Sequence, residues 1–257
     1  MTASPREFVA AYLREAPLFA AIVRGVECAL LRDAGPLERP LLDLGAGDGL
    51  FAALAFREPP DCGVDLDPRV LAEARARRAH RHLLAADATR LPFPAGAFAT
   101  IVSNSVFEHI PDLDGALGEC RRVLAPRGRL LLTAPSHTFG RMLLGSRVAA
   151  GYARWFNGHS RHFHTLSLEE WTSRLARGGF RLNRGFYYLS PRAHRVFDAA
   201  HYLSAWRWLC RHLTGRWTLS PRPWLNAFWE HWLAPLTERA WPAPEGPYLY
   251  LDANRTD

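Results

Sequence analysis

The chain has 257 residues, enough for one large domain or for a medium-sized domain with a cap, and its apolar content of 48% is that of a folded globular protein. Its formal net charge is +7, yet it contains no lysine, and the arginines are dispersed along the chain. Dispersed arginines do not form the basic tract typical of a nucleic-acid-binding protein, so we expect no nucleic acid as a partner. The polar first residues lack a secretory pattern and the four cysteines are scattered singly, which predicts a cytoplasmic protein with reduced thiols.

The first predicted elements are one or two amphipathic helices over residues 5–33. Apolar residues recur there at helical spacing, and the stretch 34–36 (Ala-Gly-Pro) ends the pattern. We therefore expect a helical cap over residues 1–36.

Short apolar runs then alternate with helix-like segments. Strands are predicted over residues 41–44, 62–66, 82–86, 99–103 and 129–134, helices over 49–56, 68–78 and 113–124, and a turn over 126–128. Strand, helix and strand repeated at this spacing predict a doubly wound parallel sheet with helices on both faces, and hence the α/β fold class.

The second half of the chain has a different character. A loop is predicted over 159–166, a helix over 167–178 with a capping box of Ser167 and Glu170, and strands over 180–188 and 248–253. The intervening residues 190–246 hold seven of the nine tryptophans. We interpret this segment as a helical insertion, which leaves residues 37–189 and 247–257 as a seven-stranded core.

A glycine-rich loop follows the first predicted strand. It reads DLGAGDG over residues 43–49, so that Gly45, Gly47 and Gly49 alternate with other residues. Glycines allow a sharp turn and a close approach of the backbone to a ligand. In open parallel sheets the ligand lies beyond the carboxyl ends of the strands, which makes this loop a candidate binding site.

The composition of the loop argues against a dinucleotide. The GxGxxG fingerprint fails because its last position is Leu50. Two carboxylates, Asp43 and Asp48, are poorly placed against a pyrophosphate, but they suit a ligand that carries an ammonium or sulfonium group.

Two later strands also end in carboxylates. Asp65, about 20 residues beyond the glycine loop, is placed to accept hydrogen bonds from ribose hydroxyls, whereas Asp67 fits the N-cap of the next helix. Asp87 follows the third strand and could accept a hydrogen bond from an adenine amino group, with a turn-forming role as the alternative.

Five motifs in this order are similar to those of the class I S-adenosylmethionine-dependent methyltransferases, in the subgroup that modifies small molecules, lipids and sugars. They are DLGAGDG, GVDLDP, DATRLPFPAGAF, IVSNSVFEHI and ECRRVLAPRGRLLLTAPS, and together they span about residues 38–136. One position departs from the family, because Ala99 stands where its members usually carry an acid.

The resemblance implies a Rossmann-like methyltransferase sheet and S-adenosylmethionine as cofactor. It implies that the glycines line the methionine part, that Asp65 holds the ribose, and that Asp87 and Ala88 contact the adenine. The cofactor contacts we expect are Asp43, Gly45, Ala46, Gly47, Gly49, Asp65, Leu66, Asp87, Ala88, Ser103, Asn104 and Ser105.

Methyl transfer requires alignment of two reactants, and a general base only where the acceptor holds a proton at neutral pH. His109, His137 and His159 are the candidate bases, since each follows a strand or lies in a loop on the expected cofactor side. The pattern formed by His159, His162 and His164 could suggest a metal, but no carboxylate stands beside it in the sequence. We therefore predict no metal site.

The acceptor has to be inferred from the cap. The insertion interleaves tryptophans with arginines, but no apolar run is long enough for a spanning helix. Such a segment could lie in a membrane interface, wall an apolar pocket, or pack the cap or a homodimer contact.

We therefore expect a methyltransferase for a hydrophobic or amphipathic small molecule, such as a lipid, isoprenoid, polyketide or lipid-linked sugar, that acts at oxygen. The alternatives are a nitrogen or carbon acceptor on a small metabolite, and a cofactor-binding scaffold without turnover.

Overall fold

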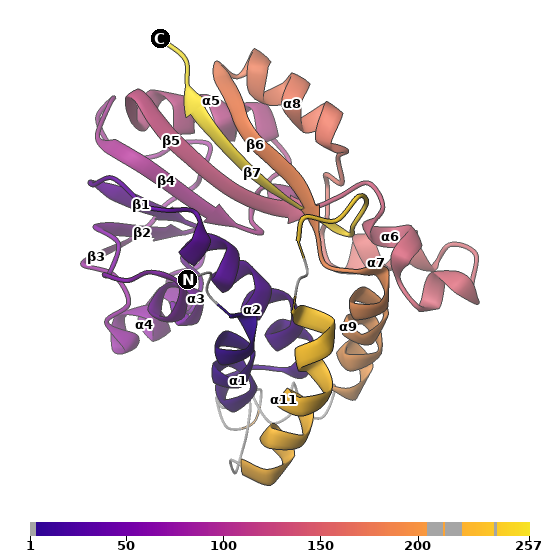
Figure 1. Cartoon of the computed structure of the whole chain (residues 1–257). Coiled ribbons are helices and arrows are strands. Elements are labelled where there is room, and N and C mark those ends of the chain that lie inside the picture. Colours follow the sequence, from indigo (N-terminus) through magenta and orange to yellow (C-terminus); the bar gives the residue numbers. More distant parts are fainter. Residues whose placement is uncertain (1–3, 205–212, 214–222, 239–240) are drawn as a thin grey trace.

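The computed structural model describes residues 4–204, 213, 223–238 and 241–257 of the chain. Seven strands form one sheet in the order β3-β2-β1-β4-β5-β7-β6 (Figure 1). The strands are β1 (Leu41–Leu44), β2 (Cys62–Asp65), β3 (His82–Ala85), β4 (Phe98–Asn104), β5 (Leu124–Pro135), β6 (Phe180–Tyr188) and β7 (Tyr248–Arg255). Strand β7 runs antiparallel to β5 and β6, and the pairs from β3 to β5 are parallel. The predicted seven-stranded, doubly wound α/β sheet is confirmed.

Alternation along the strands divides the core into two layers. Leu131 of β5 belongs to a cluster with the N-terminal helices, whereas its neighbours Leu130 and Leu132 belong to a cluster with α5 (Leu113–Val123) and α8 (Leu168–Arg177). Successive strand side chains point to opposite faces, so a continuous apolar run is buried on both sides.

Two helices form at the N-terminus. Helix α1 (Pro5–Glu15) is capped by Ser4, and α2 (Leu18–Asp33) begins after Pro17, which separates the two. Both bury an apolar stripe in the same cluster as one face of the sheet. The predicted helices over 5–33 are confirmed as a pair.

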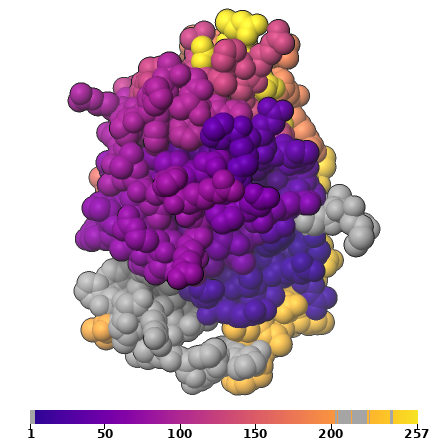
Figure 2. All heavy atoms as spheres, turned by 90° about the vertical axis from the view of Figure 1, so that its left-hand side faces the viewer, coloured from indigo at the N-terminus to yellow at the C-terminus, as the bar shows by residue number. Residues whose placement is uncertain are grey.

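Helices α9 (Pro191–Leu203) and α11 (Pro223–Thr237) cover the described part of the predicted insertion. They contact α1 and α2, and Figure 1 shows the four helices gathered at one end of the sheet. On the face drawn in Figure 2, the indigo N-terminal segment borders both the purple atoms of the part of the chain that follows it and the yellow-orange atoms of the C-terminal part. Trp206, Trp208 and Trp217 lie outside the described residues.

For the shorter elements, the sequence predicts the helix caps correctly but does not predict several of the short helices. Asp67 caps α4 (Pro68–Arg77), and Ser167 with Glu170 forms the predicted capping box. Helix α3 (Leu50–Ala55) also lies where it was expected. Periodicity did not reveal α6 (Phe139–Met142), the 3-10 helices η1 (Phe107–His109) and η2 (Gly145–Arg147), or α7 (Tyr152–His159), because all four are short.

The turn predicted over residues 126–128 lies inside β5. The pairing passes from Phe98 opposite Leu124 to Thr100 opposite Arg129, so extra residues bulge out of β5, where Arg127 has a φ of 62°. The local turn geometry is therefore present, but the strand continues on both sides of it. No helix among the described residues combines the length and the apolar character needed to cross a bilayer.

Candidate active site

A cavity of ≈ 380 Å³ lies at the carboxyl ends of β1, β2 and β4. Such a volume falls in the range of roughly 300–1,000 Å³ typical of small-molecule sites. The cavity is lined by Arg24, Leu44, Gly45, Gly47, Val64, Asp65, Leu66, Ala86, Asp87, Ala88, Asn104, Ser105, Val106, His109 and Ile110. Eight of the twelve predicted cofactor contacts belong to this lining, although they come from four separate loops of the sheet.

Two glycines of the loop after β1 are required for different reasons. Gly45 has a φ of +84°, and a Cβ there would lie 2.1 Å from Cγ2 of Val106, so a side chain would collide. Gly47 has a φ of +53°, and a Cβ there would meet nothing within 4 Å. Because Gly47 lines the cavity, its missing side chain leaves room for a ligand close to the backbone.

Asp65 shapes the glycine loop while it faces the cavity. Its Oδ2 accepts a hydrogen bond from the Gly47 N–H at 2.9 Å, and its Oδ1 accepts one from the Asp67 N–H at 3.0 Å. A carboxylate offers about four acceptor positions, so further hydrogen bonds to ligand hydroxyls remain available.

Asp87 forms a turn and also lines the cavity. Its Oδ1 accepts hydrogen bonds from the backbone N–H and the hydroxyl of Thr89, both at 2.8 Å, which is a turn-forming arrangement. It nevertheless lines the cavity beside Ala88 and Leu66, and the Leu66 residue is 73% exposed.

Four predicted contacts lie outside this lining, namely Asp43, Ala46, Gly49 and Ser103. Asp43 is buried and pairs with Nε2 of His80 at 2.7 Å. Gly49 precedes α3 in a left-handed conformation, and a Cβ there would lie 2.9 Å from the backbone of α4. The hydroxyl of Ser103 donates to the carbonyl oxygen of Leu44 at 3.1 Å. Gly49 and Ser103 thus join elements of the fold.

A second cavity, of ≈ 280 Å³, lies under the N-terminal helices. Aromatic side chains of Tyr12, Phe19 and Phe51 contribute to its wall, and Asp43 and Ala46 also line it. It shares four lining residues with the first cavity: Arg24, Gly45, Gly47 and Asn104. The two spaces therefore meet at the glycine loop.

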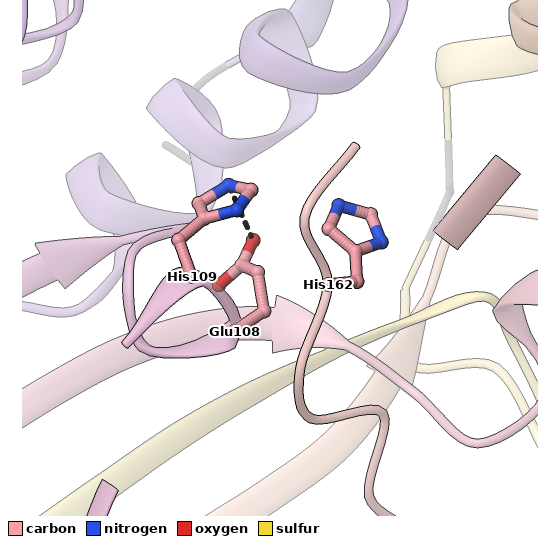
Figure 3. Close-up of side chains that lie close together, drawn as sticks. All are labelled: Glu108, His109 and His162. Atoms are coloured by element: carbon pink, nitrogen blue, oxygen red, sulfur yellow. Dashed lines mark ion pairs between the residues drawn. The ribbon is translucent and has the colours of Figure 1, made fainter. Parts of the chain in front are cut away.

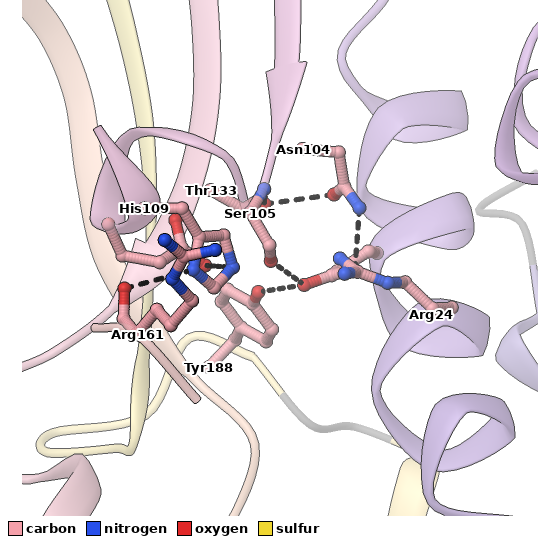
Figure 4. A network of polar contacts seen from close by, with 9 residues as sticks. Arg24, Asn104, Ser105, His109, Thr133, Arg161 and Tyr188 are labelled. Carbon is pink, nitrogen blue, oxygen red and sulfur yellow. Dashed lines mark hydrogen bonds and ion pairs between the residues drawn. The ribbon is translucent and has the colours of Figure 1, made fainter. Parts of the chain in front are cut away.

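A buried carboxylate, Glu27 of α2, joins the cap to the sheet (Figure 4). It accepts hydrogen bonds from Arg24 at 2.7 Å, from the amide of Asn104 at 2.9 Å, from the hydroxyl of Ser105 at 3.1 Å and from the hydroxyl of Tyr188 at 2.7 Å. Burial, together with the nearby carboxylate, raises the pKa of the Tyr188 hydroxyl well above its usual range, so the tyrosine stays a donor. One side chain thereby fixes residues of α2, β4 and β6.

Of the three predicted bases, His109 lines the cavity. Its Nδ1 lies 3.2 Å from the carbonyl oxygen of Arg161, to which an N–H can donate, and burial lowers its pKa. The imidazole is therefore neutral at pH 7 with Nε2 free to accept a proton. His137 packs against Tyr187 instead, and the exposed His159 stacks on Trp155; neither belongs to the lining of the described cavities.

The fold also places a carboxylate beside two histidines, which the sequence did not suggest. Glu108 is 3% exposed, and burial raises its pKa to about 8. Its Oε1 lies 3.9 Å from Nε2 of His109, and His162 comes from the segment after α7 that runs beside η1 (Figure 3). The argument that no carboxylate accompanies these histidines therefore does not hold in the folded chain.

Sequence reasoning missed Arg24, Glu27 and Glu108. Helical periodicity offers a signal for Glu27, which lies one turn after the buried Val23 on an apolar stripe where an acid is unusual. Glu108 carries no such signal, because burial of a residue in a three-residue 3-10 helix depends on the segments packed around it.

Comparison with known proteins gives a consistent result. Residues 42–132 match the family model described as "Methyltransferase domain". A demethylmenaquinone methyltransferase of Thermus thermophilus is 41% identical over 99 residues, which are 36% of this chain and 45% of the relative. A malonyl-[acyl-carrier protein] O-methyltransferase of Geobacter sulfurreducens is 36% identical over 148 residues, 55% of each chain. The chain thus spans about half the length of these curated relatives.

Solved structures share the fold at low sequence identity. A geranyl diphosphate methyltransferase in complex with GPP and sinefungin has a TM-score of 0.58 and 16% identity, over 90% of this chain and 78% of the other. A sarcosine dimethylglycine methyltransferase from Galdieria sulphuraria, whose assignment is provisional in its description, has a TM-score of 0.57 and 20% identity, over 91% and 84% of the two chains. The shared fold therefore extends well beyond residues 42–132, which match the family model.

Proposed function

Because the chain belongs to the class I S-adenosylmethionine-dependent methyltransferases, we propose that it transfers the methyl group of this cofactor to an oxygen of a hydrophobic or amphipathic small molecule. The observation that carries the proposal is the convergence of the glycine loop, Asp65 and Asp87 on one cavity. Three loops that are separate in the sequence thereby face a single nucleoside-sized space.

The nucleoside half of the cofactor fits the first cavity. Asp65 would accept hydrogen bonds from the ribose hydroxyls, and Asp87 with the backbone of Ala88 would bind the adenine edge. The open space at Gly47, where a Cβ would meet no atom, accommodates a ligand against the loop backbone.

We assign the amino-acid end of the cofactor to the junction of the two cavities. Arg24 and Asn104 line both spaces there, together with Gly45. A guanidinium suits a carboxylate, and Arg24 keeps its orientation through the 2.7 Å bond to Glu27. Arg24 would thus bind the carboxylate of the methionine part.

The bound cofactor supplies a methyl group already activated by its positively charged sulfur. The residues of this chain then have to orient the acceptor in line with it and to exclude water. His109 is the side chain we propose as base, because it lines the cavity, and its neutral Nε2 can take a proton from an acceptor hydroxyl.

An apolar acceptor is supported by the second cavity and by the relatives. The wall that Tyr12, Phe19 and Phe51 form offers aromatic surface next to the junction. The similar proteins include one named as a demethylmenaquinone methyltransferase.

Incubation of the purified chain with methyl-labelled cofactor and a lipid extract tests the proposal. We expect label in the organic phase, bound as a methyl ether or ester and reduced with Asp65→Ala at a limiting cofactor concentration. Label confined to polar metabolites, or tight binding of S-adenosylhomocysteine without turnover on any extract, would contradict it.

We propose further that the cap contacts a membrane surface, which is where such an acceptor resides. Trp224, Phe228 and Trp232 lie at successive helical turns of α11 and are 67%, 48% and 61% exposed, whereas Leu233 is buried. An aromatic stripe of this kind suits a lipid interface. Co-sedimentation with anionic vesicles should fall when the three are changed to serine; a loss of dimer without loss of vesicle binding would assign the stripe to a second copy.

A further inference from the structure

The cluster of Glu108, His109 and His162 has the chemistry and spacing of a metal site. One ligand atom of each residue lies within 4.8 Å of the others. Two ligands held about 2.1 Å from one ion are about 3–3.5 Å apart, so small side-chain rotations bring the three atoms to bonding distance. Glu108 and His109 are adjacent on η1, and the N–H of Phe163 donates to the carbonyl oxygen of Glu108 at 2.8 Å, which fixes the third residue's segment beside them.

One carboxylate oxygen of Glu108 lacks a hydrogen-bond partner in the described part of the chain. Its Oε2 is buried and has no hydrogen-bond partner among the described residues. A buried polar atom left in this state costs about 1–3 kcal/mol, and more if it is charged. The ring of His162 is likewise packed, with its Nδ1 buried and without a partner. Each of these two neighbouring side chains therefore has one buried polar atom that no described residue hydrogen-bonds and that could bind a cation.

His109 is held in the orientation that a metal ligand requires. Its Nδ1 is within 3.2 Å of the Arg161 carbonyl oxygen, so that the N–H donates there and the lone pair resides on Nε2. A backbone carbonyl opposite the ligating nitrogen is the usual support of a metal-bound histidine. The free Nε2 faces the Glu108 carboxylate.

The surrounding charge permits a cation. Two guanidinium groups act on the cluster: that of Arg161, which influences His109, and that of Arg24, which influences both Glu108 and His109. The charge of Arg24 is balanced by Glu27 at 2.7 Å. The buried carboxyl group of Glu108 would lose its proton to solvent as it bound a divalent ion, as metal ligands ordinarily do.

We propose that Glu108, His109 and His162 bind one divalent transition-metal ion. Two imidazoles and one carboxylate favour an ion such as Zn²⁺, Mn²⁺ or Fe²⁺ over Mg²⁺ or Ca²⁺, which prefer oxygen ligands. Three protein ligands leave coordination positions open, and His109 places the cluster at the wall of the first cavity.

A role for the ion depends on the proposed function. An open position beside the cavity would bind the acceptor oxygen and lower the pKa of its hydroxyl, so that the proton leaves to water. The oxygen would then bond to the methyl carbon as the carbon–sulfur bond of the cofactor breaks, and His109 would act as a ligand and not as a free base. A catechol, an enol or a hydroxy acid, each with a second oxygen for the ion, would be favoured over a simple alcohol.

Calorimetric titration of the chelator-treated chain with Mn²⁺ and with Zn²⁺ tests the site without reliance on turnover. We expect one ion per chain, with the affinity reduced at least tenfold in Glu108→Gln and in His162→Asn. His82→Gln, which changes an exposed histidine of β3, should leave it unchanged. Binding of S-adenosylhomocysteine, measured in all four proteins, reports that each has folded.

Equal metal affinity in the four proteins would overturn the proposal, as would a wild-type stoichiometry near zero. Because the titration uses no acceptor, a methyltransferase assay that fails leaves this result intact, and a metal titration that fails leaves the cofactor cavity intact.

Discussion

The sheet residues and the cap residues around the two cavities are brought together in different ways. On the sheet side, the glycine loop, Asp65 and Asp87 each follow a strand directly, so neighbouring parallel strands bring them to one edge. On the cap side, Arg24 and Glu27 come from a helix that precedes the sheet, and Tyr188 from β6 meets them. The sheet side is built from local motifs, and the cap side from contacts between distant segments.

This difference indicates which side of the site mainly determines ligand affinity and which mainly determines stability. Residues of the sheet side are held by backbone turns and by short hydrogen bonds within and between neighbouring loops, as the bonds that Asp65 accepts from Gly47 and Asp67 show. Glu27 instead connects three elements through one buried carboxylate. Changes on the cap side should therefore act first on stability, and changes on the sheet side first on cofactor affinity.

The largest effect is expected from Glu27→Ala. Removal of this carboxylate leaves Arg24 and the hydroxyl of Tyr188 without their shared acceptor, and loss of one partner of a buried pair costs about 3–5 kcal/mol. Urea unfolding should show this loss. Glu7→Ala, an exposed acid of α1, should change the free energy of unfolding by less than about 0.5 kcal/mol. Equal effects would mean that the cap is not held through Glu27.

Acid should destabilise the cap through His194. This buried residue of α9 lies against Phe139, and burial lowers its pKa to about 3. A depressed folded pKa stabilises the protein above the unfolded value near 6.5, and the contribution is lost as pH falls toward 3. Between pH 7 and 4 the wild type should lose about 2–3 kcal/mol more than His194→Gln.

The control for this measurement is His82→Gln, which should retain the wild-type pH dependence because His82 is exposed. Parallel pH curves for the wild type and His194→Gln would show that His194 can be protonated without loss of packing.

On the sheet side, Asp65→Ala should weaken binding of S-adenosylhomocysteine by about 1–3 kcal/mol, or about 5- to 150-fold, because a charged hydrogen-bond partner is lost. Calorimetry provides the affinity. Asp67→Ala removes a nearby acid that caps α4 and pairs with Arg69 on the surface, so it should lower stability by about 1 kcal/mol and leave the affinity unchanged. If both variants bind equally well, Asp65 does not hold the ribose.

The smallest effect is expected from Gly47→Ala. Comparison with Gly35→Ala separates the stability lost through backbone strain from the affinity lost through contact with the ligand. Gly47→Ala and Gly35→Ala both place a Cβ at positive φ, at +53° and +82°, with no atom within 4 Å. Each should lose about 1–2 kcal/mol of stability. Affinity for S-adenosylhomocysteine should fall several-fold in Gly47→Ala alone, because Gly35 lies outside the cofactor cavity. A loss in both would point to a general effect of strain.

Local signals predicted most of the sheet and the cofactor half of the site. Strand ends, the N-cap at Asp67 and the capping box at Ser167 depend on residues close in the chain, and the structure confirms them. The same signals did not separate Gly49 and Ser103, which join secondary-structure elements, from Gly47, which lines the cavity. That distinction depends on which atoms pack against each residue.

The sequence by itself determined the α/β class, the succession of strands and helices along the chain and the edge at which a nucleoside is expected, because periodicity and turn residues act over a few positions. Only the tertiary structure decided that Arg24 lies at the junction of two cavities, that His109 alone among the candidate bases faces the first, and that Glu108 is buried beside two histidines. These features arise from contacts between segments far apart in the chain, for which local spacing carries no information.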